Sequence, residues 1–197
     1  MSRTLVVACG ALARELVALR RANGWEHVDI ACLPAHWHNT PERIVPGVEA
    51  KILEARAEGR RVLVAYGDCG TGGRLDAMLA RHGVERLPGA HCYAFFAGVD
   101  VFEALAEPEP GTFYLTDYLA ANFDRLVMRE LGIHRHPELR EVYFGHYTRL
   151  LYLAQDGVRA LDEARAAARS LGLPLEVHRT GFAPFETALR TIGIAAA

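Results

Sequence analysis

The chain has 197 residues, of which 51% are hydrophobic and 23% are charged, a composition that suits one globular domain with a substantial core. Its formal net charge is -2, and its basic residues are scattered, which argues against nucleic acid as a partner. Charges interrupt every apolar segment before it reaches the length of a membrane span. The amino terminus lacks the apolar region of a signal peptide, so we expect a cytoplasmic protein that makes no membrane contact.

Strand and helix patterns alternate through the first half of the chain. Apolar runs predict strands at 5–8, 28–33, 61–66 and 84–87. Helical spacing and breakers predict helices at 11–22, 41–59, 74–82 and 93–106. Thr40 is the predicted N-cap of the second helix, with Pro41 at the first helical position.

The rhythm of these units loosens after Gly83, and Pro108 to Gly111 form a clear break. Further strands are predicted at 112–115 and 175–177, and further helices up to about 132 and at 137–154, 158–171 and 184–192. The repeated strand–helix units predict an α/β fold. We expect a single domain over residues 1–197, with a mostly parallel open sheet and helices on both faces.

Three of the four cysteines lie where strands give way to helices. Cys9 ends the first strand, Cys69 lies in the turn after the third, and Cys92 precedes the helix expected at 93. A parallel sheet brings such turns to one edge, which is where ligands bind. In a reducing cytoplasm these thiols suggest metal ligands or thiol chemistry rather than disulfides. Cys32 sits within or just after a strand and is assigned to the core.

Three thiolates suit either zinc or an iron–sulfur cluster and leave a fourth position for histidine, water or substrate. His38, in the loop after the second strand, is the expected nitrogen ligand and a candidate catalytic residue. Helix N-termini behind the turns are expected to favour the thiolate form. No Cys-x-x-Cys motif is present, and any one of the three could equally be an ordinary buried cysteine.

The segment 67–73, Gly-Asp-Cys-Gly-Thr-Gly-Gly, resembles an anion cradle at a helix N-terminus. It lacks the ending of a nucleotide P-loop and the order of a dinucleotide fingerprint. A nucleotide is therefore disfavoured, and binding of a small carboxylate or phosphate stays open. The candidate binding residues are Gly10, Gly67, Gly70, Thr71 and Gly72. Asp68 could act as a base, or could simply bond to the backbone of its own turn.

Several motifs together resemble an uncharacterised family of proteins of unknown function, DUF1638, from about Leu5 to about Tyr147. They are Ala8-Cys9-Gly10 with Glu15, His38-Asn39-Thr40-Pro41, Tyr66-Gly67-Asp68-Cys69-Gly70, His91-Cys92 and Thr112-Phe113-Tyr114-Leu115-Thr116. The resemblance implies that Cys9, Cys69 and Cys92 are the family's cysteines and that Cys32 is peculiar to this chain. It also makes Glu15 a candidate catalytic residue.

The same resemblance implies a role near corrinoid-dependent methyltransferases, in methyl or one-carbon metabolism. The chain has no Asp-x-His-x-x-Gly corrinoid motif, so any cobalamin would belong to a partner. Three hypotheses stay open. The first is a metal–thiolate protein acting on a small-molecule substrate, and the second is a metal-free racemase or isomerase of a small carboxylate that uses Cys9 and Cys69. The third is a non-catalytic accessory protein of a methyltransferase system.

The aromatic stretch 143–148 indicates core packing or a contact in a homo-oligomer.

Overall fold

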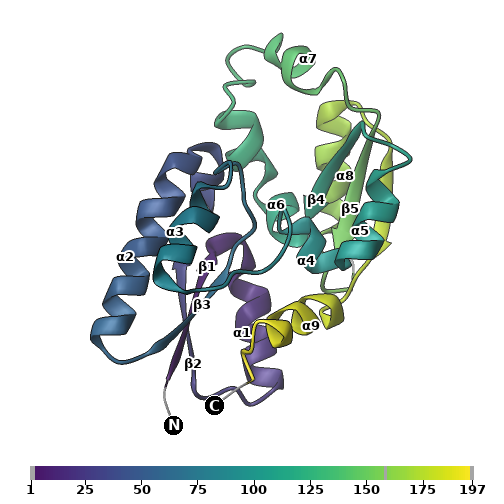
Figure 1. Cartoon of the computed structure of the whole chain (residues 1–197). Helices are drawn as coiled ribbons and strands as arrows, with labels where there is room; N and C mark the ends of the chain where they lie inside the picture. Colours follow the sequence, from purple (N-terminus) through teal and green to yellow (C-terminus); the bar gives the residue numbers. More distant parts are fainter. Residues whose placement is uncertain (1–2, 158, 196–197) are drawn as a thin grey trace. The chain divides into compact units, whose positions relative to one another are not determined.

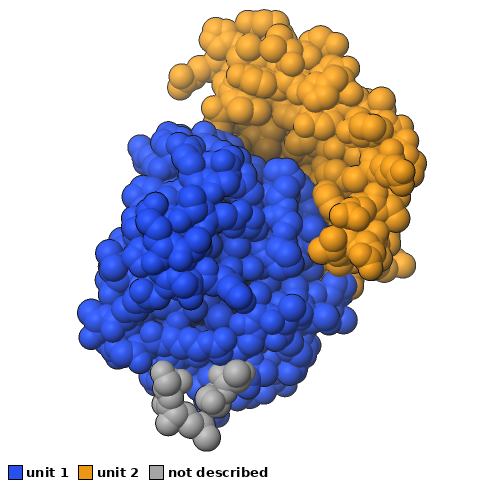
Figure 2. All heavy atoms as spheres, viewed as in Figure 1, with its two compact units in different colours: residues 1–95, 183–197 blue, residues 96–182 orange. Residues whose placement is uncertain are grey.

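The computed structural model describes residues 3–157 and 159–195 and has the α/β fold with parallel strands that the sequence predicts (Figure 1). Contacts divide the chain into two compact units, residues 1–95 with 183–197 and residues 96–182 (Figure 2). Each unit contains one three-stranded parallel sheet flanked by helices. The expected fold class is therefore confirmed, with its strands divided between two sheets.

The sheet of the first unit consists of β1 (Thr4–Cys9), β2 (Val28–Leu33) and β3 (Arg61–Ala65), in the order β2-β1-β3. The apolar residues of β1 are buried on both faces, as is usual for the central strand of a parallel sheet. The chain passes from β1 to β2 on one side and then returns across β1 to β3. The direction of the connections therefore reverses between β1 and β3, which makes a topological switch point at the carboxyl ends of these strands.

Helices cover both faces of this sheet (Figure 1). They include α1 (Ala13–Ala22), α2 (Ile44–Ala57), α3 (Arg74–His82) and α9 (Ala183–Thr191), together with the short helices η1 (Gly10–Leu12), η2 (Ala35–Asn39) and η3 (Pro41–Arg43). The short helix α4 (Tyr93–Ala97) spans the boundary between the two units. Buried residues of α2 and α3 form one core cluster with the strand side chains that include Leu5, Val7 and Val64. α9 returns to the unit near α1, where the Arg190 guanidinium lies 5.3 Å from the centre of the Trp25 ring.

The sheet of the second unit consists of β4 (Thr112–Thr116), β5 (Arg149–Ala154) and β6 (Leu175–Arg179). Its order, β4-β5-β6, follows the chain, so this sheet contains no reversal between neighbouring strands. The accompanying helices are α5 (Val99–Ala106), α6 (Asp117–Ala121), the π-helix η4 (Asp124–Arg129), α7 (Leu139–Phe144) and α8 (Leu161–Leu171). None of the helices in the described residues combines the length and apolarity needed to cross a membrane.

Three of the predicted elements differ in the structure. The helix expected at 137–154 is wrong, because only α7 is helical and the following buried run is β5; a short run that is apolar on every side fits a buried strand as well as a helix. The helix expected at 93–106 breaks at Gly98, whose φ is 86°. The strand expected at 84–87 is reduced to one bridge between Val64 and Arg86.

The expected cap of the second helix is also different. Thr40 precedes η3, with Pro41 at its start, but its side chain makes no capping hydrogen bond. The remaining predicted strands and helices agree with the structure to within a few residues. Val158, the predicted start of α8, lies outside the described residues.

A buried polar network ties together the carboxyl ends of β4 and β5. The Tyr152 hydroxyl donates to Asp117 Oδ1 at 2.6 Å, and the backbone N–H groups of Gln155 and Asp156 donate to the same carboxylate at 3.2 and 3.1 Å. In return, the Asp117 N–H donates to Gln155 Oε1 at 2.7 Å. The Asp117 carboxylate is thus used by its own unit to join two loops, so we assign it a structural role.

We predict that Asp117→Asn lowers the free energy of unfolding by about 2 kcal/mol, because the new amide group would face a donor and leave it unsatisfied in the interior. Urea denaturation followed by circular dichroism would measure the loss. Asp162→Asn is the matched control, since Asp162 is an exposed residue of α8 that pairs with Arg165 at 3.0 Å. A loss for Asp117→Asn no larger than that of the control would contradict the structural role.

Candidate functional site

Two cysteines lie at the switch point of the first sheet. Cys9 is the last residue of β1, where it pairs in register with Leu33 of β2, and Cys69 lies in the turn that follows β3. The chain after Cys9 turns tightly against β2, because a Cβ atom at Gly10 would lie 3.0 Å from the Leu33 carbonyl oxygen. Gly10 is therefore explained by this close approach of two backbones.

Backbone hydrogen bonds bring the segment that carries Cys92 to the same edge. The Asp68 N–H donates to the Gly89 carbonyl at 3.3 Å, and the Cys69 N–H donates to the Ala90 carbonyl at 2.9 Å. Gly67 allows this contact, since a Cβ atom there would lie 3.0 Å from the Ala90 oxygen. The three cysteines singled out in the sequence are thus held by neighbouring segments of one unit.

The turn that contains Cys69 is strained. Cys69 has φ of 49° and is the only non-glycine residue with positive φ in the described part of the chain. The left-handed conformation is unfavourable for a residue with a Cβ atom, by about 1 kcal/mol relative to glycine. A non-glycine residue held in this way suggests a function for its side chain.

Asp68 is the residue that stabilises this turn. Its carboxylate accepts hydrogen bonds from the Thr71 hydroxyl at 2.7 Å and from the N–H groups of Gly73 and Gly72 at 2.8 and 3.0 Å. The Thr71 hydroxyl, and then these two N–H groups, lower the pKa of Asp68. Of the two roles weighed for Asp68, the geometry favours the turn residue over the base. The donors that we expected to bind an external anion are used by this internal carboxylate.

Burial dominates the electrostatics of the cysteines. It raises the pKa of Cys9, raises that of Cys69 to about 12, and raises that of Cys92 well above the ordinary value. Negative charge on Cys9 would raise the pKa of Cys69 further, and charge on either would raise that of Cys92. Backbone N–H groups at Ala11 and Gly67 oppose burial only in part. For these thiols, burial outweighs the lowering of the pKa by backbone N–H groups.

Tyr66 is a member of the site that our sequence reasoning missed. The residue is 2% exposed, and its hydroxyl makes no hydrogen bond of ordinary geometry within the described residues, although it lies beside the Cys9 thiol and lowers the pKa of Cys9. Burial, followed by the charges that Cys9 and Cys69 would carry, strongly raises the pKa of Tyr66. The signal in the sequence was a tyrosine at the carboxyl end of a buried strand, directly before the glycine-rich turn.

The other candidate residues lie around this cluster. Glu15 is buried in the first turn of α1, near enough for its charge to raise the pKa of Cys92. His38 lies near His91, and the surrounding protein and the His91 charge lower the pKa of His38. The His38 residue itself is exposed at the surface of the unit.

Cys32 was expected in the core, and this expectation is wrong, because the residue is exposed. It lies near the end of β2, the strand at the edge of its sheet, which leaves it less covered than a central position. Across residues 3–157 and 159–195, no three His, Cys, Asp or Glu side chains are arranged so that they could hold a metal ion as they stand.

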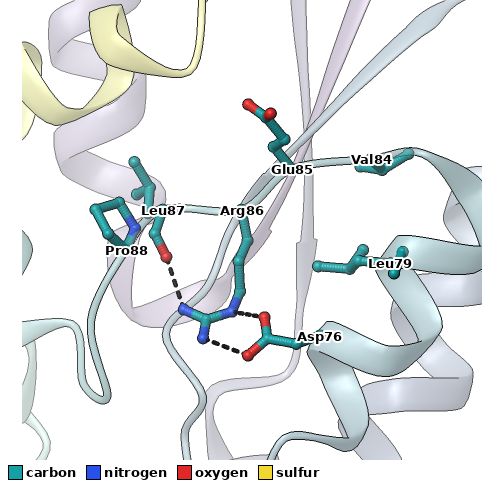
Figure 3. Close-up of a pocket in the computed structure, with 8 residues that line it drawn as sticks. Asp76, Leu79, Val84, Glu85, Arg86, Leu87 and Pro88 are labelled. Atoms are coloured by element: carbon teal, nitrogen blue, oxygen red, sulfur yellow. Dashed lines mark hydrogen bonds and ion pairs between the residues drawn. The ribbon is translucent and has the colours of Figure 1, made fainter.

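The Arg86 side chain supports the segment 86–89, which leads to Cys92 (Figure 3). Its Nε and Nη2 atoms donate to the two carboxylate oxygens of Asp76 at 2.6 and 2.8 Å. Its Nη1 atom donates to the carbonyls of Leu87 at 2.7 Å and Gly89 at 2.9 Å. The Gly89 carbonyl also accepts from the Asp68 N–H. One guanidinium group thus supports the contact between the turn of Cys69 and the segment of Cys92.

We predict that Arg86→Lys lowers the free energy of unfolding by about 1 kcal/mol at pH 7, because an ammonium group cannot reproduce the bidentate pair and both carbonyl contacts. The Arg86 guanidinium lowers the pKa of Asp76. The stabilisation by the pair of Asp76 and Arg86 is therefore complete above the ordinary pKa of an aspartate, about 4. It is lost as the pH falls through the lower pKa that Asp76 has in the folded protein. Urea denaturation from pH 7 to pH 3 would show the difference shrinking in acid.

Arg165→Lys is the control for this prediction, since Arg165 pairs with Asp162 on the exposed side of α8. It should change stability by less than about 0.5 kcal/mol. Equal effects of the two substitutions would show that Arg86 does not stabilise this segment.

Comparison with known proteins gives one match. Residues 32–189 match the family described as "Protein of unknown function (DUF1638)", a stretch that includes Cys69 and Cys92, whereas Cys9 precedes it. No curated protein and no solved structure is significantly similar to the chain. The match covers most of the chain and confirms the resemblance seen in its motifs. The protein belongs to the DUF1638 family.

Proposed function

We propose that Cys9, Cys69 and Cys92 bind a metal centre at the carboxyl edge of the first sheet, and that this centre is an iron–sulfur cluster. The observation that carries the proposal is their convergence from three separate segments. Cys9 and Cys69 lie at the β1/β3 switch point, and backbone hydrogen bonds hold the segment of Cys92 against the turn of Cys69. Such a position is where open parallel sheets bind ligands.

The chemistry of the three side chains supports a cation at this edge. Thiolates are preferred ligands of zinc and of iron in clusters. The charge on one thiolate raises the pKa of its neighbours, so the site disfavours several thiolates without a compensating positive charge. A bound metal centre would supply that charge and replace the thiol protons.

The arrangement of the cysteines favours a cluster over a single zinc ion. A zinc ion requires its ligands to converge on one point at about 2.3 Å from each sulfur, and the described residues contain no such ready-made group. In a four-iron cluster, each thiolate would bind a different iron atom, so the sulfurs need not converge as closely. Three cysteines also leave one iron open to a substrate, as in the metal hypothesis stated from the sequence.

The strain at Cys69 is consistent with this proposal. Glycine would adopt the same φ of 49° without cost, yet the chain has a cysteine there, with its side chain buried. A thiol that is retained in spite of the backbone strain fits a ligand better than a packing residue. We further propose that the protein acts in the cytoplasm, where thiols stay reduced. Its expected link to corrinoid methyl transfer stays a prediction.

We predict near-stoichiometric iron and acid-labile sulfide in the full chain purified, or reconstituted, without oxygen. Cys9→Ser, Cys69→Ser and Cys92→Ser should each lose most of the metal, because each removes one of three ligands. Metal and sulfide analysis, together with the visible absorption spectrum, would measure this. Cys32→Ser is the matched control, since Cys32 is an exposed cysteine of the same unit, and it should keep the full metal content.

The outcomes separate the alternatives. Zinc in place of iron, lost in the same three variants, would keep the three-cysteine site but contradict the cluster. Retention of metal by Cys92→Ser would exclude a three-cysteine centre. A folded wild-type protein that takes up no metal would overturn the proposal and favour metal-free chemistry by Cys9 and Cys69, which proton exchange at the α-carbon of small carboxylates would then test.

A further inference from the structure

We propose that Tyr66 is a positioning residue of this centre: its hydroxyl group donates a hydrogen bond to the Cys9 sulfur when that sulfur is a metal ligand. The inference rests on the proposed three-cysteine site and adds a residue and a role to it. The Tyr66 hydroxyl makes no hydrogen bond of ordinary geometry within the described residues, yet it lies close enough to the Cys9 thiol for the two groups to change each other's pKa.

Strand register places the two side chains together. β1 and β3 pair in parallel with Ala8 opposite Ala65, so the next residues, Cys9 and Tyr66, come opposite one another. Paired residues of adjacent parallel strands point to the same face of the sheet. In agreement with this, Cys9 packs against the core cluster that contains Tyr66 and Cys69.

The state of the Cys9 sulfur explains why the hydroxyl lacks a strong acceptor. A neutral thiol is a weak acceptor, whereas a thiolate is a strong one. A buried hydroxyl without a hydrogen bond is costly and calls for an explanation. In the metal-bound protein the Cys9 sulfur would carry negative charge and would accept a hydrogen bond from the Tyr66 hydroxyl, which would then be satisfied.

This hydrogen bond would have two effects on the centre. It would fix the orientation of a ligand, as groups around metal ligands commonly do. It would also stabilise the more negative, reduced state of an iron–sulfur cluster and so raise its reduction potential, since hydrogen bonds to the sulfurs help to set that potential. Phenylalanine fills the same space without the hydroxyl, so it isolates both effects.

The experiment compares wild type and Tyr66→Phe as full chains, reconstituted with iron and sulfide without oxygen. We expect Tyr66→Phe to bind the same amount of metal, to lose it to a chelator at about tenfold lower chelator concentration, and to have a lower midpoint potential. Tyr152→Phe is the control, because the Tyr152 hydroxyl bonds Asp117 in residues 96–182. It should lower folding stability and leave metal retention and potential unchanged.

Each result decides between the two proposals. If the wild type binds metal and Tyr66→Phe has the same chelator resistance and the same midpoint potential, the role of Tyr66 is overturned and the three-cysteine centre stays intact. A wild type that binds no metal would overturn both. If the protein holds zinc, chelator competition alone still distinguishes Tyr66→Phe from the control.

Discussion

The contact between the turn after β3 and the segment 89–92 is the constraint on which the site depends. Two backbone hydrogen bonds, from Asp68 to Gly89 and from Cys69 to Ala90, join these segments, and the Arg86 guanidinium supports the Gly89 carbonyl from the other side. The β2-β1-β3 order places Cys9 beside this contact. Together with the bridge between Val64 and Arg86, this contact fixes the segment that carries Cys92 at the same edge as the other two cysteines.

The carboxyl edges of the two sheets are built in different ways. In residues 96–182, Asp117, Tyr152 and Gln155 satisfy one another in a closed network. In the first unit, the corresponding edge has a strained Cys69, a buried Tyr66 hydroxyl that makes no hydrogen bond of ordinary geometry within the described residues, and thiols whose pKa is raised by burial. Local rules of stability are most often broken at functional sites. The contrast therefore favours the first edge as the place where a ligand binds.

The sequence predicted the parallel α/β class and the placement of Cys9 and Cys69 because β-branched runs that end in turn residues have few other interpretations. It could not predict the division into two sheets, since pairing between strands is not encoded in the pattern of one strand. The sequence predicted a helix at β5 because every residue after Arg149 is apolar and buried, which removes the alternation that identifies a strand. Tyr66 was missed because its importance lies in an unmet hydrogen bond, which depends on what surrounds it.

The separation of the three cysteines along the chain has a consequence for assembly. A Cys-x-x-Cys motif offers two ligands before folding, whereas here the ligands meet only after β1, β3 and the segment 89–92 have come together. Metal binding would therefore select the folded first unit and stabilise it. The backbone strain at Cys69 would destabilise this edge of the sheet in the metal-free protein. In the metal-bound protein, the bond between the metal and the Cys69 sulfur would offset that strain. The same cysteines would then serve both as the reactive site and as a cross-link between distant segments.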